Sequence, residues 1–141
     1  MAKRNFNGVQ INQSVTITEV AGADIADVRN RILAYDANGN VILAADGTAV
    51  PVGIAIIEAG INDISGAESG KVATGDQVDI QIKDIGYVIA GGAIAKGDEI
   101  TATAGEATKA AAGNYVIGIA LSKATARGEY VRVQIAKYQK N

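Results

Sequence analysis

The feature that most limits the fold of this chain is a pattern that it contains twice. Each copy begins with Gly-Ile-Ala, at residues 53–55 and 118–120, and later reaches a glycine followed by an acidic residue, Gly75-Asp76 and Gly128-Glu129. Apolar side chains then take every second position: Val78, Ile80 and Ile82, and again Val131, Val133 and Ile135. A period of two indicates a strand with one buried face. The copies therefore predict either two related halves of one fold or two strands that lie side by side.

Alternating runs bounded by turn residues continue along the chain and predict about ten short strands. Asn38-Gly39 is a preferred two-residue turn for a hairpin within residues 31–44. Gly97-Asp98 belongs to a third, partial copy of the turn that precedes a strand. Residues 25–32 fit a short helix or turn capped by Asp24, although a strand that begins near Arg31 fits better. We expect exposed loops at residues 60–72 and 103–113.

The core of this chain has to be built from small and branched aliphatic side chains. Aromatic residues make up 4% of the sequence, Trp is absent, and 17 glycines are available for turns. Many short strands must cover their edges by closing into a barrel, by stacking two sheets or by pairing with other subunits. We predict an all-β fold, a small barrel or sandwich of the β-clip or β-tulip kind. In it, residues 1–8 form a flexible N-terminal arm and residues 9–141 a single β domain.

Charge and hydropathy exclude several classes of partner. The net charge is −2 and the isoelectric point is near 5.1, so we expect no nucleic-acid partner, which would require a surface that neutralises phosphates. No stretch approaches the roughly 20 apolar residues of a membrane span. The N-terminal residues lack the apolar core of a signal peptide. We expect a protein that is made in the cytosol and does not contact a membrane.

The residue types needed for most catalytic and metal sites are missing. The chain has neither His nor Cys, which excludes Ser-His and Cys-His nucleophiles and the usual zinc sites. Residues 36–40 start like a calcium loop but lack its later Gly and Glu, so a hairpin turn explains them better. The remaining candidates for acid–base work or magnesium binding fall at predicted turns or exposed faces, where carboxylates are simply solvated: Asp24/Asp27, Asp76/Asp79 and Asp98/Glu99. We predict no enzyme, no metal and no cofactor, and we expect the five tyrosines at core edges or subunit interfaces.

Residues 92–135 carry a resemblance to a known family. Gly92-Ala93-Ile94-Ala95 is followed by Gly97-Asp98, then by the segment Tyr115–Leu121 and the strand Gly128–Val133. This order resembles the C-terminal half of the small capsid cement, or decoration, proteins of tailed bacteriophages. Residues 30–55 are similar to the strand, turn, strand and Pro-x-Gly segment of that family. The likeness spans roughly residues 24–135, and the chain departs from the family in its N-terminal strand and in a longer loop at residues 60–72.

The resemblance implies a structural virion protein that adds to the outside of an assembled head, commonly as a trimer. Its partners would be the major capsid protein and two further copies of itself. A protein that binds only the assembled shell stabilises it by mass action. The candidate capsid-binding residues are Lys3, Arg4, Asn5 and Phe6: the two cations fit an acidic shell, and Phe6 is the only Phe. The alternative interpretation is that this arm is a frayed terminus that makes no contact with the capsid.

Two other functions stay open at this point. One is a small β-barrel module that binds a carbohydrate or a protein, because residues 93–101 also resemble part of the β-clip sugar-binding modules. The other is a glycosidase that uses carboxylates alone, which would need two facing carboxyl groups in a cleft. The scarcity of aromatic residues disfavours the glycosidase.

Overall fold

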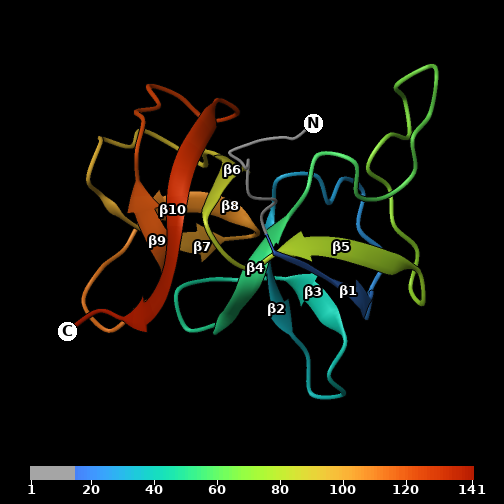
Figure 1. The fold of residues 1–141 in the computed structure, drawn as a ribbon, viewed down its shortest axis with the longest axis horizontal. Coiled ribbons are helices and arrows are strands. Elements are labelled where there is room, and N and C mark those ends of the chain that lie inside the picture. Colours follow the sequence, from blue (N-terminus) through green and yellow to red (C-terminus); the bar gives the residue numbers. More distant parts are fainter. Residues whose placement is uncertain (1–14) are drawn as a thin grey trace, which may run out of the picture.

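The computed structural model describes residues 15–141, which form ten strands and contain no helix (Figure 1). The first five strands are β1 (Thr16–Val20), β2 (Ile32–Tyr35), β3 (Val41–Leu43), β4 (Pro51–Ala55) and β5 (Gln77–Gln81). The second five are β6 (Ile85–Ile89), β7 (Glu99–Thr103), β8 (Glu106–Lys109), β9 (Tyr115–Ala120) and β10 (Tyr130–Gln139). The prediction of an all-β fold is confirmed, and so is the start of a strand, rather than a helix, next to Arg31.

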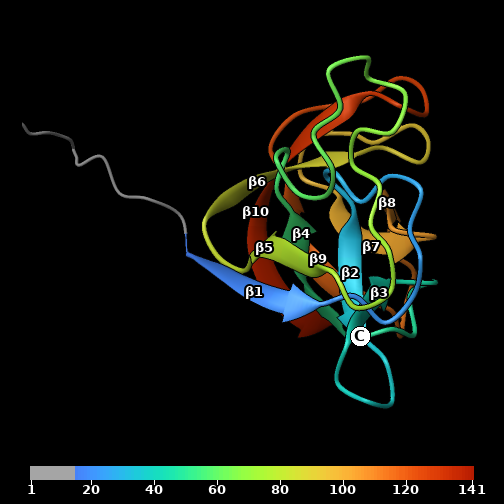
Figure 2. The same ribbon diagram turned by 90° about the vertical axis from the view of Figure 1, so that its right-hand side faces the viewer.

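The two sets of five strands have the same topology. The first sheet has the strand order β1-β5-β4-β2-β3 and the second β6-β10-β9-β7-β8, so β1 corresponds to β6, β2 to β7 and so on through β5 and β10. Every ladder within the two sheets is antiparallel. The sheets lie side by side along the long axis of the molecule in Figure 1, and one lies behind the other when the molecule is viewed from its end in Figure 2. The repeated sequence pattern therefore marks two related halves and not two neighbouring strands.

The correspondence extends to single residues. Ile54 on β4 pairs with Gln81 on β5, and Ile119 on β9 pairs with Gln134 on β10. Each of these isoleucines follows the glycine of a Gly-Ile-Ala copy. A Cβ on Gly53 would lie 2.2 Å from the Gln81 carbonyl oxygen, and one on Gly118 would lie 2.1 Å from the Gln134 carbonyl oxygen. Both copies thus need glycine because the neighbouring strand's backbone occupies the space that a side chain would take.

Each sheet curls so that its two edge strands approach one another. A single parallel bridge joins Ala21, just after β1, to Val41 on β3, and the equivalent bridge joins Ala90, just after β6, to Ala107 on β8. These contacts cover part of the edges that a short-stranded sheet otherwise leaves open. The turns that lead into β5 and β10 contain Gly75 and Gly128, both with a φ of 94°, a conformation that favours glycine.

The core is aliphatic, as expected from the composition. One cluster of buried side chains belongs to the first half and is centred on β4, β5 and the segment around Val28. The other combines the second half with four residues from the first, Ile32, Ala34, Ala44 and Ile54. Backbone hydrogen bonds also cross between the halves, for example from Ile32 N to the Gly105 carbonyl at 2.8 Å. The two halves therefore pack against each other through a shared core and do not form separate domains.

Two details of the sequence prediction are wrong. The hairpin of β2 and β3 has a five-residue connection, residues 36–40, because the Asp36 carboxylate accepts the backbone N–H groups of Asn38 and Asn40 and widens the turn. Residues 103–113 are not only a loop, since they contain β8. The turn predicted at Gly97-Asp98 is confirmed, since it leads into β7. Because β7 corresponds to β2, this third copy of the turn does not occupy a position equivalent to that of the other two copies.

Candidate interaction surfaces

The four candidate capsid-binding residues, Lys3, Arg4, Asn5 and Phe6, lie outside the residues that the structure describes, and so does the arm of residues 1–8. The described chain begins beside an edge strand, because Val15 accepts a hydrogen bond from Ile82 N at 3.0 Å and then leads into β1. β1 is the outermost strand of the first sheet.

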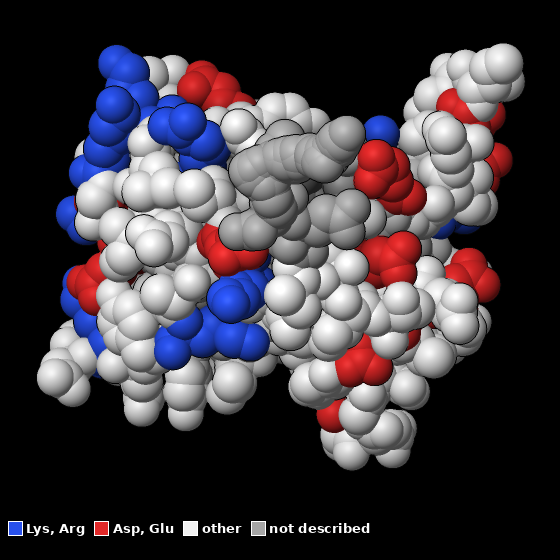
Figure 3. Space-filling model, viewed as in Figure 1, with Lys and Arg blue, Asp and Glu red and all other residues white. Residues whose placement is uncertain are grey.

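Charge is divided unequally between the halves. Residues 15–84 contain four Lys or Arg and eleven Asp or Glu, a net charge of −7. Residues 85–141 contain seven Lys or Arg and four Asp or Glu, a net charge of +3. Figure 3 shows basic side chains gathered over the side that carries β9 and β10, and acidic side chains over the side that carries β1 and β5. The overall charge of −2 hides this polarity, which gives the molecule an acidic and a basic end.

The carboxylates of the first half are held by local partners. Asp24 accepts hydrogen bonds from the backbone N and the Oγ1 of Thr74 at 2.8 and 2.9 Å, and these bonds, the backbone one first, lower the pKa of Asp24. Asp27 receives two bonds of 2.9 Å from the Arg29 guanidinium, which holds the pKa of Asp27 below its usual value. Asp76 and Asp79 instead accept bonds from Ala73 N and Thr18 Oγ1.

The second half shows the same arrangement. Asp98 accepts a bond from Ala95 N, whereas Glu99 accepts bonds from Tyr138 Oη at 2.6 Å and Lys140 Nζ at 2.9 Å. The Tyr138 and Lys140 contacts lower the pKa of Glu99, and the bond to Glu99 raises the pKa of Tyr138 to about 12. The pairs named from the sequence thus build turns and surface contacts, and within residues 15–141 no three His, Cys, Asp or Glu side chains gather in a way that would hold a metal ion.

An apolar hollow with two tyrosines lies between the halves. It has a volume of about 310 Å³ and is lined by Ile54, Ala55, Ile56, Ile57, Gln81, Asn30, Tyr87 and Tyr130. Tyr87 and Tyr130 are about half exposed and lie diagonally across the β6–β10 pair. Asn30 is 6% exposed and donates from Nδ2 to the Tyr87 carbonyl at 3.0 Å, while its Oδ1 has no hydrogen-bond partner in the described part of the chain. We call this feature the tyrosine hollow.

Residues 57–71, which we call the Ile64 loop, project from the first half at one end of the molecule (Figure 1). The loop carries the most exposed large apolar side chain among the described residues, Ile64, with a relative exposure of 105%. Ile57 and Ile61 in the same loop are about half exposed. An exposed loop with three isoleucines is a candidate contact surface.

A second hollow, of about 580 Å³, lies on the other half. Its floor is made by Ala93, Ile94 and Ala95, and Lys96, Lys109 and Lys123 surround it together with Asp98. We call it the lysine hollow. Lys109 Nζ lies 3.7 Å from Asp98 Oδ1. Among the described residues, Lys96 and Lys123 have no carboxylate within salt-bridge distance.

The comparisons with known proteins bear on the whole chain. A scan against protein-family models gave no match, and a search of curated proteins gave none either. Among solved structures, the chain is similar to the crystal structure of the head fiber gp8.5 N base in bacteriophage phi29. The identity is 26%, the TM-score is 0.63, and the likeness covers 92% of this chain and 99% of that chain. It supports the prediction of a structural protein of a phage virion, whereas membership of the cement family stays a prediction.

Sequence reasoning missed both hollows and the division of charge. The tyrosines were expected at core edges or subunit interfaces, and four of them, Tyr35, Tyr87, Tyr130 and Tyr138, are between 40% and 53% exposed. The charge division was readable from the sequence once the boundary between the halves, near residue 84, was known. No local signal in the sequence brings Lys96, Lys109 and Lys123 together. The described residues also contain no helix that could span a membrane.

Proposed function

We propose that this protein binds the outside of an assembled phage capsid as a homotrimer and stabilises it, without a catalytic role. The observation that supports this proposal best is the likeness, over nearly the whole chain, to a protein that belongs to a phage head fiber. The partner would be the major capsid protein, and the protein would be made in the host cytoplasm before it joins the virion.

The fold suits a protein whose task is to hold other proteins in place. Two curled sheets share an aliphatic core, and their carboxylates are engaged in turns and surface ion pairs. A protein that binds the assembled shell and not its dissociated subunits shifts the equilibrium toward assembly. A trimer that touches several capsid subunits gains a further 10²- to 10⁴-fold, roughly, through effective concentration.

The arm of residues 1–8 is our candidate for the capsid contact. Lys3 and Arg4 fit an acidic shell, and Phe6 can act as an apolar anchor. The backbone of the arm can also add a strand to a neighbouring protein.

Purified protein can be mixed with mature heads that lack it and with immature heads of the same phage. We expect co-sedimentation with the mature heads and an increase in the temperature at which they lose their DNA. A variant that lacks residues 1–8 should bind at least tenfold more weakly while its own unfolding temperature is unchanged. If the wild-type protein does not sediment with mature heads, the proposal is wrong, and if the shortened variant binds equally well, only the role of the arm is wrong.

The tyrosine hollow favours a second candidate, a module that binds a carbohydrate. Tyrosine faces pack against sugar rings, and Asn30, whose buried Oδ1 has no hydrogen-bond partner within residues 15–141, lines the same hollow. Binding to isolated glycans, measured on an array with Tyr130→Ala as the matched variant, tests this function. Binding that needs Tyr130 and no capsid would support it, and an array without signal at millimolar sugar would refute it.

A further inference from the structure

The Ile64 loop is much longer than the equivalent connection in the second half. In the first half, fifteen residues, 57–71, connect Ile56 to the bridge between Val72 and Ile25. In the second half, the equivalent bridge joins Ala124 to Ile94, and only Ser122 and Lys123 connect it to Leu121. Ala59 is buried in the core of the first half. Because two residues close the same connection in an otherwise equivalent half, the exposed residues beyond Ala59 point to a role other than folding.

The loop is also held in one conformation. Ile61 and Lys71 form a short stem, in which Ile61 N donates to the Lys71 carbonyl at 3.0 Å and Gly70 N donates to the Ile61 carbonyl at 2.7 Å. Gly70 packs on the ion pair of Asp27 and Arg29, whose atoms would lie within 3 Å of a Cβ at that position. The base of the loop is therefore fixed to the body of the first half.

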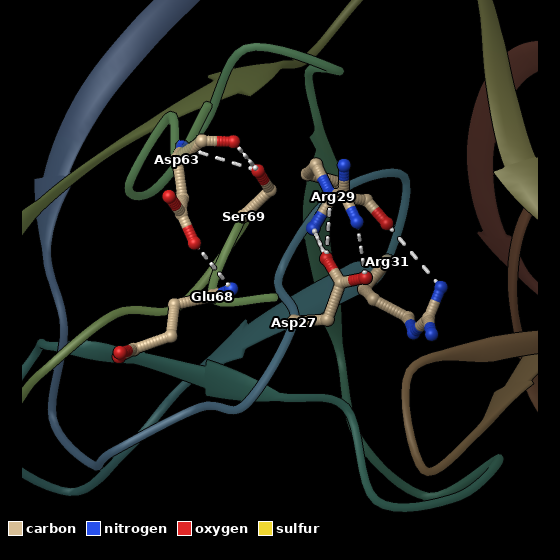
Figure 4. Close-up of polar contacts among 6 residues, drawn as sticks. All are labelled: Asp27, Arg29, Arg31, Asp63, Glu68 and Ser69. Carbon is tan, nitrogen blue, oxygen red and sulfur yellow. Dashed lines mark hydrogen bonds and ion pairs between the residues drawn. The ribbon is translucent and has the colours of Figure 1, made fainter. Parts of the chain in front are cut away.

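The tip of the loop is ordered by one carboxylate. The Asp63 carboxylate accepts bonds from Ser65 N and Ser65 Oγ. It also accepts a bond from Glu68 N, while the backbone N–H and carbonyl of Asp63 both bond to Ser69 Oγ at 3.1 Å (Figure 4). Ile64 sits between these bonded residues and contributes no buried surface to its own chain. A rigid turn that holds an apolar side chain in water loses little conformational entropy when that side chain is buried by a partner.

The lysine hollow lies where the second half lacks such a loop. In the first half, the stem of the loop runs beside the segment after Ile25, and Val28 N donates to the Gly70 carbonyl at 2.9 Å. In the second half, the connection through Lys123 stops short, and the equivalent surface over Ala93, Ile94 and Ala95 stays open. The hollow thus lies at the place in the second half that corresponds to the base of the Ile64 loop in the first half.

We propose that the Ile64 loop of one copy docks into the lysine hollow of the next copy. The loop contains three acidic residues and one Lys, a net charge of −2, while the hollow has three Lys and one Asp, a net charge of +2. Ile64 would meet the apolar floor, and the loop's acidic groups would lie near Lys96 and Lys123. The loop belongs to the acidic half and the hollow to the basic half, so the wider surfaces attract as well.

The contact joins two different surfaces and is therefore heterologous. In Figure 1 the loop projects at one end of the long axis, and the segments that form the hollow, residues 93–98 and 121–124, lie toward the other end. A contact of this kind closes into a ring when its rotation allows and otherwise continues as a filament. This inference rests on the proposed homotrimer and assigns the surfaces that would close it.

The test uses the full chain with variants in the loop and in the hollow. Ile64→Asp removes the apolar contact, Lys96→Glu with Lys123→Glu reverses the hollow, and Val50→Asp is the matched control, since Val50 is 60% exposed and lies outside both surfaces. All four affected side chains are exposed, so unfolding temperatures should change little. Mass is measured by light scattering and analytical ultracentrifugation across micromolar concentrations and two salt concentrations.

We expect trimers from the wild type and from Val50→Asp, with at least roughly tenfold weaker association for the other two variants. High salt should weaken the wild-type trimer. An equimolar mixture of Ile64→Asp and the double Lys variant is the decisive sample, because one intact loop and one intact hollow remain. This mixture should form dimers that do not grow further, because each dimer has an altered loop and an altered hollow at its free ends. An interface between two identical patches would not restore association in the mixture.

Several results would overturn the inference. A wild type that is monomeric throughout, or an Ile64→Asp variant that stays trimeric, shows that the loop does not join the copies. If that trimeric variant also loses binding to heads, the loop contacts the shell instead. Replacing only the tip of the loop, residues 62–69, with Asn-Gly provides a second check, since this variant keeps the buried Ala59 and the stem and should be folded and monomeric. The proposed function is judged separately, by whether wild-type protein sediments with mature heads.

Discussion

Replacing Gly118 with alanine tests the claim that the repeated Gly-Ile-Ala pattern exists for a steric reason. The new Cβ would lie 2.1 Å from the Gln134 carbonyl oxygen, whereas ordinary van der Waals contact begins at 3.4 Å. The obstacle is backbone, so no side chain can rotate away. β9 and β10 would have to separate by about an ångström at the centre of the second sheet.

The cost follows from this separation. Overpacking typically costs about 1–3 kcal/mol, and weakening the two neighbouring backbone hydrogen bonds adds about 1 kcal/mol. Alanine offsets about 0.4–1 kcal/mol of this cost because it lowers the conformational entropy of the unfolded chain. We expect a net loss of about 3 kcal/mol in the free energy of unfolding. With an unfolding entropy of about 2 cal/mol/K per residue, this lowers Tm by about 10 °C.

Gly53→Ala should have a similar effect, because its Cβ would lie 2.2 Å from the Gln81 carbonyl oxygen in the other half. Gly92→Ala is the control, since no atom lies within 4 Å of its Cβ position. Thermal and urea unfolding followed by circular dichroism measure all three. A decrease in Tm of less than about 3 °C for Gly118→Ala, or equal values for Gly118→Ala and Gly92→Ala, would refute the steric explanation.

Two further predictions concern the first half. Asp27→Ala should cost about 1 kcal/mol in urea unfolding at pH 7, the upper end for a largely exposed ion pair. Arg29 lowers the pKa of Asp27, so the ion pair stabilises the fold above the unfolded pKa of Asp, and this stabilisation is lost as the pH falls through the folded pKa. The unfolding free energies of wild type and variant should therefore converge near pH 2. A difference that stays constant with pH would contradict this assignment. Asn30→Asp should cost about 3 kcal/mol at pH 7, since a buried carboxylate would face the Tyr87 carbonyl without a donor. Asn30→Gly should cost only about 1 kcal/mol, because glycine tolerates the φ of 56°, and equal losses from both variants would contradict the explanation.

Part of this fold was predictable because it depends on neighbouring residues. Alternation at Val78, Ile80 and Ile82 reveals a strand with one buried face, since successive side chains point to opposite sides. β8 was missed for a related reason. Its sequence is Glu-Ala-Thr-Lys, and of its four side chains only Ala107 is buried, so an edge strand leaves almost no period-two signal.

What the amino-acid sequence determined by itself is local: the all-β class, the aliphatic core, the glycine turns and the presence of two similar segments. The tertiary structure alone decided that β5 lies between β1 and β4, and that β10 lies between β6 and β9. It also decided that Lys96, Lys109 and Lys123 surround one hollow. Backbone preferences and the period of side chains act over a few residues, whereas the pairing of strands and the gathering of distant charges depend on how the whole chain closes around its core.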